Sequence, residues 1–183
     1  MYPYTVSDYF NADIRITDII NVWKQHTEKW SRPEKLPRSS HGLVYFVSGT
    51  IEYDLNGEHF TVFPGQVLRL PKGIPYSGRK VDAGEAAFII VDFDTVEDDE
   101  YAALPLPTVV TPAQPEIIAK KFEELFSVWS SKLFCSRLRC RVLLLELLSM
   151  MMVDYAENSL FLKQKQITID IMHYIQNNFN NPK

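Results

Sequence analysis

The turn residues in positions 65–80 constrain the fold of this chain more than any other feature of its sequence. Gly65 and Pro71 are separated by five residues, and Gly73 and Tyr76 follow after one and two further residues. Because Gly and Pro interrupt regular structure, the segments between them have room only for short strands. Short strands between closely spaced turns are typical of a small β-sandwich or β-barrel.

An Asn56-Gly57 pair just before this stretch predicts a tight hairpin between residues 50–55 and 58–63. Both central residues of such a turn need a positive φ, which Asn and Gly adopt readily. The strand predicted over 86–93 is apolar throughout, so we expect it to be buried on both faces. Further strands are predicted over residues 14–22, 43–47 and 66–70.

A connector with three prolines, at positions 107, 112 and 115, separates this β region from a helical one. Helical periodicity predicts helices over 116–130 and about 134–157. The second helix is apolar around most of its circumference, which calls for two packing partners. We expect one face to cover the barrel and the other to form a dimer, although a single thick core would explain the pattern too. The predicted dimerisation residues are Leu143, Leu147, Met150 and Met151.

The end of the chain predicts a third zone. Residues 163–166 form a polar stretch that we interpret as a linker, and 167–179 have the pattern of an amphipathic helix. A helix of this length is marginal in isolation, so we expect it to open a further domain. The predicted domains are therefore 1–105, 106–162 and 163–183.

Composition limits the function of the chain. Its 183 residues suffice for one well-buried core, and its net charge of −4 argues against this chain alone wrapping nucleic acid. No signal peptide is visible, and the apolar run 142–153 is too short to span a bilayer. We expect a cytoplasmic protein with two reduced cysteines, Cys135 and Cys140.

The turn spacing resembles that of metal-binding β-barrels of the cupin group. Those barrels carry a His-x-His pair and a Glu before the hairpin and a further His after it. The matching positions here are Pro37, Arg38, Gly42 and Tyr76, and a lone His41 nearby does not make a site. We therefore predict no metal, no cofactor and no enzymatic activity, with a small cupin-type sugar isomerase or oxygenase as the alternative.

The order of motifs resembles the N-terminal domain of AraC-type bacterial transcription regulators. The resemblance rests on Arg32-Pro33, the segment 43–49 (LVYFVSG), the Asn56-Gly57 hairpin, the segment 64–76 (PGQVLRLPKGIPY) and the segment 167–182. It implies a fold that is mainly β with C-terminal helices: a cupin-like β-barrel of the jelly-roll type followed by an α-helical pair. It also implies a helix-turn-helix DNA-binding domain that begins near residue 163.

The resemblance also implies where a small-molecule effector binds. Pro3 lies in an N-terminal arm and Arg32 matches an arginine, both of which contact sugar in a member of the family. Phe88 and Ile90 match pocket positions that are His and Trp in that member, although both side chains suit plain core packing as well. From its chemistry we add Tyr45 or Tyr76, whose hydroxyl and apolar ring suit a binding pocket.

We therefore predict an effector-sensing and dimerisation domain of a transcription regulator. The expected partners are a small molecule, such as a sugar or a related metabolite, and a second copy of the chain. DNA is expected to be bound by the following domain rather than by this one. A binding module without a role in transcription remains a further alternative.

Overall fold

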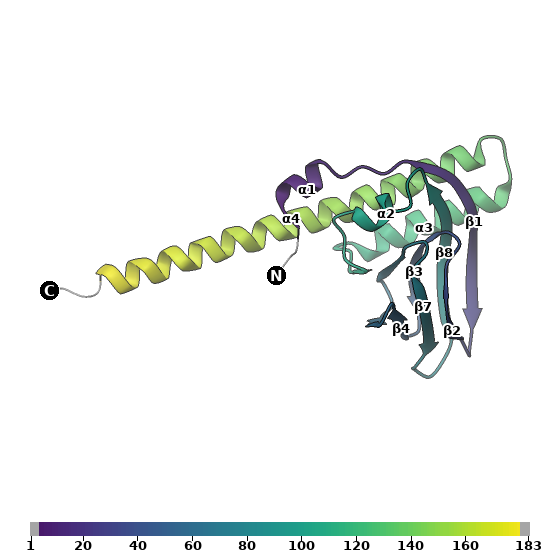
Figure 1. Cartoon of the computed structure of the whole chain (residues 1–183), viewed down its shortest axis with the longest axis horizontal. Coiled ribbons are helices and arrows are strands. Elements are labelled where there is room, and N and C mark those ends of the chain that lie inside the picture. The colour runs from purple at the N-terminus through teal and green to yellow at the C-terminus, as the bar shows by residue number, and fades with distance from the viewer. Residues whose placement is uncertain (1–3, 180–183) are drawn as a thin grey trace.

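The computed structural model describes residues 4–179 and shows two antiparallel β-sheets packed face to face, with helices along one side (Figure 1). The five-stranded sheet has the order β1-β8-β3-β6-β9 and the four-stranded sheet the order β2-β7-β4-β5. The strands are β1 (Ile16–Thr27), β2 (Ser31–Pro37), β3 (His41–Ser48), β4 (Ile51–Leu55), β5 (Glu58–Val62), β6 (Val67–Leu70), β7 (Pro75–Lys80), β8 (Ala86–Thr95) and β9 (Val109–Val110). The fold class is thus the cupin-like one that the sequence predicts.

The turn chemistry accounts for several of these strands. Asn56 and Gly57 have φ values of 51° and 91°, as the tight hairpin between β4 and β5 requires. The sequence analysis missed β2 and β7, which both contain proline. β2 is an edge strand and Pro75 is the first residue of β7, and both places tolerate the missing amide hydrogen.

Strand β8 lies between β1 and β3 and is buried on both faces, as predicted. Its side chains alternate between two apolar clusters. Phe88 and Ile90 belong to the inner core between the two sheets. Ile89, Val91 and Phe93 belong to the outer core between the five-stranded sheet and the helices.

Two helices, α3 (Pro115–Ser131) and α4 (Ser136–Phe179), cover the outer face of the five-stranded sheet (Figure 1). Pro115 occupies the first turn of α3, where its missing amide hydrogen costs no bond. Lys132 ends α3 in the left-handed conformation. Two short helices complete the fold: α1 (Val6–Phe10) and α2 (Glu100–Ala103).

The sequence analysis predicted a linker over residues 163–166. The predicted conformation is wrong, because these residues are helical and lie inside α4. The helix has 44 residues, and its C-terminal part projects beyond the sheets (Figure 1). The stretch Lys-Gln-Lys-Gln is polar, but Lys and Gln are good helix formers, so its polarity does not interrupt the helix.

Where the five-stranded sheet meets α2, His41 is fully buried between the rings of Phe93 and Tyr101. Its Nδ1 accepts a hydrogen bond of 2.9 Å from the backbone N–H of Lys72, which leaves the proton of the neutral ring on Nε2. Nε2 lies 3.1 Å from the hydroxyl of Thr95. Burial lowers the pKa of His41, although the carboxylates of Asp98 and Asp94 oppose the shift.

This imidazole should make stability depend on pH. Because its pKa is depressed in the folded chain, its contribution is complete above pH 6.5 and is lost as the pH falls toward the folded pKa. We expect the free energy of unfolding, measured in urea, to decline by up to about 1.4 kcal/mol per pH unit between pH 6.5 and 5.

In His41→Gln this decline should be absent. His26→Gln, which removes an imidazole whose side chain is 61% exposed, serves as the control for loss of one imidazole. An identical pH dependence in His41→Gln and the wild type would contradict the assignment.

Candidate functional site

Charged side chains gather around the ring of Tyr76 on β7, at the edge of the apolar inner core. We call this the inner-face site. It is formed by Arg32 on β2, Arg38 just after β2, Tyr76, and the inward-facing row of β8. That row consists of Phe88, Ile90 and Asp92.

Arg38 is held by three partners. Its guanidinium forms an ion pair with Asp92, and both side chains are almost completely buried. Nη1 donates to the hydroxyl of Tyr76 over 3.3 Å, and Nε donates to the backbone oxygen of Ser40 over 3.2 Å. Burial raises the pKa of Asp92 above its ordinary value, against the opposing effect of Arg38. Burying the charged form of Asp92 therefore costs free energy, and the ion pair with Arg38 offsets part of this cost.

Gly42 on β3 makes room for this ion pair. A Cβ atom at position 42 would lie 3.0 Å from Nη2 of Arg38, so a side chain there would displace the guanidinium. The sequence analysis treated Gly42 and Arg38 only as positions where metal ligands are missing. A glycine inside a buried strand often marks the close approach of another group, and this signal pointed to the site.

Arg32 lies on the face of the same aromatic ring. Its Cζ atom is 4.4 Å from the centroid of the Tyr76 ring, within the range of a cation–π contact. Its Nε is buried and has no hydrogen-bond partner among the described residues. Tyr76 therefore carries one guanidinium on its ring face and a second at its hydroxyl.

The rest of the inner wall is aromatic and aliphatic. The indole of Trp30 packs against Phe88 and Tyr53, with ring centroids 6.0 Å and 5.5 Å apart. Tyr53 in turn lies 6.4 Å from Tyr76. Such rings offer a large apolar surface with few hydrogen-bonding groups.

Four of the predicted effector-binding residues lie on this inner face: Arg32, Tyr76, Phe88 and Ile90. Tyr45 does not, because it lies on the opposite face of its strand. Its ring stacks on Phe122 of α3, with centroids 5.4 Å apart, and it belongs to the outer core. Pro3 lies outside the described residues.

The predicted dimerisation residues also need correction. Leu143, Leu147 and Met151 are buried in the outer core of their own chain, and Met150 packs against its edge. They form the stripe of α4 that covers the sheet. The other apolar stripe of α4 is exposed and includes Leu138, Val142, Leu145 and Val153.

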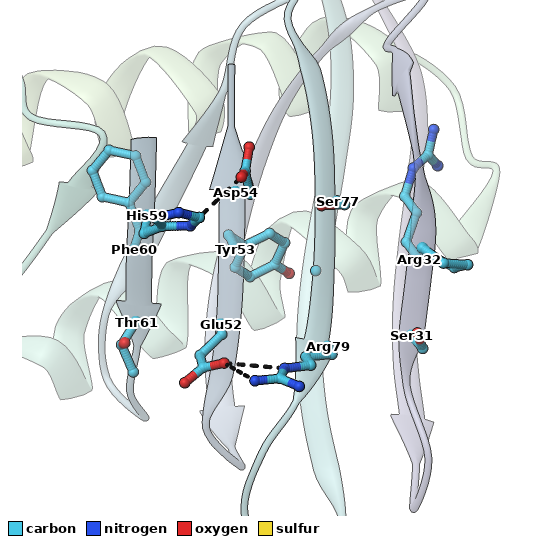
Figure 2. A pocket seen from close by; sticks show the side chains of 12 residues that line it. Ser31, Arg32, Glu52, Tyr53, Asp54, His59, Phe60, Thr61, Ser77 and Arg79 are labelled. Carbon is cyan, nitrogen blue, oxygen red and sulfur yellow. Dashed lines mark hydrogen bonds and ion pairs between the residues drawn. The ribbon is translucent and has the colours of Figure 1, made fainter. Parts of the chain in front are cut away.

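A hollow of about 550 Å³ lies on the outer face of the four-stranded sheet (Figure 2). Arg79 and Glu52 form an exposed ion pair of 2.9 Å there, and His59 lies 3.5 Å from Asp54. Figure 2 shows the guanidinium of Arg32 on β2, pointing away from both pairs. Arg32 also lines this hollow, but neither of these two pairs includes it.

A second hollow, of about 360 Å³, lies where the N-terminal segment crosses the end of the two sheets. The hydroxyl of Tyr4 donates to the backbone oxygen of Leu106 over 3.2 Å at its rim. Arg69 beneath it donates to backbone oxygens of the segment 101–106. The chain between α2 and β9 is thus tied to both β6 and the N-terminal segment.

The comparisons with known proteins agree with this architecture. A solved structure of the AraC-like transcriptional activator CuxR has a TM-score of 0.50 at 18% identity, and the match covers 74% of this chain and 51% of that one. A cupin protein with a double-stranded β-helix from Methanocaldococcus jannaschii has a TM-score of 0.39 at 10% identity, covering 45% of this chain and 79% of that one. No curated protein matches the sequence.

Residues 24–148 match the family model of the AraC-like ligand-binding domain, and the chain belongs to this family. Within the described residues, no helix is long and apolar enough to cross a membrane. No group of three or more His, Cys, Asp or Glu side chains in residues 4–179 is arranged to hold a metal ion.

The buried ion pair should be important for stability. We expect Arg38→Met to lower the free energy of unfolding by about 3–5 kcal/mol, because it leaves Asp92 buried without its partner. Arg79→Met is the matched control: it breaks an ion pair whose side chains are 71% and 45% exposed, and should cost less than about 1 kcal/mol. Urea unfolding measures both, and equal losses would contradict the role assigned to Arg38.

Proposed function

We propose that this chain is the effector-sensing and dimerisation domain of a DNA-binding transcription regulator. The match of residues 24–148 to the AraC-like ligand-binding domain carries the proposal. The inner-face site supports it, because charged groups at the edge of an apolar interior suit the binding of one small molecule. The DNA-binding domain would begin near residue 163, in the C-terminal part of α4.

The proposed signal runs from the inner-face site to α4. The N-terminal segment contacts the end of the sheets through Tyr4, and α1 lies against α4 (Figure 1). An effector that orders this segment would therefore change what α4 contacts. It can shift the equilibrium between two arrangements only by the difference in its affinity for them.

Effector binding is tested by thermal-shift screening of the purified protein against sugars, sugar acids and small aromatic compounds. A ligand at 100 times its Kd should add about 2.7 kcal/mol of stability. Ile90→Ala should weaken binding of the same ligand, measured by calorimetry, because it removes part of the inner wall. Val47→Ala is the control, because Val47 lies on β3 with its side chain 49% exposed and does not belong to the inner core. Unchanged affinity in Ile90→Ala would place the ligand elsewhere.

The dimer is proposed to use the exposed stripe of α4. Leu138, Val142 and Leu145 follow the four-and-three spacing of a coiled-coil seam, and Val153 lies on the same side of the helix. A second copy of this helix would cover the stripe. This replaces the buried stripe that the sequence analysis had assigned to the dimer.

Leu145→Glu should therefore weaken the dimer at least about tenfold, because each copy would bring a charge into an apolar seam. Val81→Glu, at an exposed valine in the turn after β7, is the control. Sedimentation velocity over a range of concentrations measures the association. A dimer equally stable in Leu145→Glu and the control would refute this interface.

A further inference from the structure

Two guanidinium groups and one carboxylate surround the ring of Tyr76. Among the described residues, Asp92 forms an ion pair with Arg38 and none with Arg32. Arg32 has neither an ion pair nor a hydrogen bond to its side chain among the described residues. Among the described side chains, one positive charge at this site is therefore left without a counter-charge.

An uncompensated charge of this kind is expensive when water is partly excluded from it. The Nε of Arg32 is already out of contact with water, and its Cζ lies 4.4 Å from the centroid of the Tyr76 ring. A cation–π contact offsets only part of the loss of hydration. A bound anion next to Arg32 would compensate this charge and offset the cost of its burial.

The geometry favours a carboxylate over other anions. The Arg32 guanidinium keeps its terminal N–H groups free of hydrogen-bond partners among the described residues, and such a group binds a planar carboxylate in a two-point fork. The hydroxyl of Tyr76 accepts from Arg38, and its own proton has no acceptor among the described residues. It is thus a further donor beside Arg32.

The side chains around the inner-face site favour a ligand whose remaining part is apolar. Phe88 and Ile90 face the inner core, and the indole of Trp23, opposite Ile90 on β1, packs against the same cluster. β1 and β2 are edge strands of the two sheets, so Trp23 and Arg32 stand on strands with free edges. A sugar would need several hydrogen-bonding partners, which Trp23, Phe88 and Ile90 do not provide.

We propose that the effector is a small carboxylate with an apolar or aromatic body, whose carboxylate binds Arg32 and the Tyr76 hydroxyl and whose body packs on Ile90 and Trp23. This inference rests on the proposed effector-sensing function. It replaces the sugar that the family resemblance implied with an organic acid.

The first test uses the protein without ligand. Arg32→Met removes the uncompensated charge and keeps an apolar contact with the ring of Tyr76, so the Tm should stay the same or rise. Arg38→Met should lower the Tm by several degrees, because Arg38 is the partner of Asp92. A comparable loss in Arg32→Met would show that Arg32 holds the fold together and would overturn the proposal.

The second test uses matched pairs of probes at pH 7 and constant ionic strength. The pairs are benzoate and benzamide, phenylacetate and phenylacetamide, and gluconate and glucose. Binding is followed by the Tm and by tryptophan fluorescence, since Trp23 and Trp30 both pack against the inner core. We expect the aromatic acids to bind at least tenfold more tightly than their amides and than gluconate.

The same titrations in two variants locate the carboxylate. Arg32→Met should weaken binding of the aromatic acids at least tenfold, whereas Arg79→Met, which removes the exposed arginine of the outer hollow, should leave it unchanged. Tighter binding of glucose or of an amide, or equal affinity in Arg32→Met, would overturn the proposal. If neutral ligands from the wider screen bind while these acids do not, the proposal of a carboxylate effector is refuted and the proposed effector-sensing function stands. If no compound binds in either screen, both proposals are refuted.

Discussion

The structure depends on one strand being buried on both sides. β8 lies between β1 and β3 in the five-stranded sheet, and its alternating side chains belong to two separate cores. Apolar burial on both faces fixes the register, because a slip by one residue would exchange the two sets. It also places Asp92, the single acidic residue of the inward-facing row between 88 and 92, against Arg38.

Some strands and turns were predictable from local sequence, although the proline-containing β2 and β7 were missed. The hairpin at Asn56-Gly57 and the apolar strand 86–93 each follow from residue types at adjacent positions. The pairing of Arg38 with Asp92 was not, because 54 residues separate them and only the fold brings them together. Tyr45 was misplaced for a related reason: its neighbours on β3 are apolar on both sides, so the local pattern does not say which face points inward.

The same limit applies to α4. Its apolar residues form two stripes, and periodicity alone does not tell which stripe meets the chain's own sheet. The packing settles it: Leu143 and Leu147 face the sheet, whereas Val142 and Leu145 are exposed. The Lys-Gln-Lys-Gln stretch was misjudged because its polarity was taken for a break, although Lys and Gln both favour helix.

The unbroken course of α4 has a mechanical consequence. Its buried stripe ends at Met151, and 28 residues follow to Phe179. At 1.5 Å per residue these span about 42 Å. A straight rod of this length acts as a lever: a tilt of about 5° at the sheet would move its far end by about 4 Å. A repacking of less than an ångström where α1 and the outer core hold the helix would thus be enlarged several-fold at Phe179, without any hinge along the way.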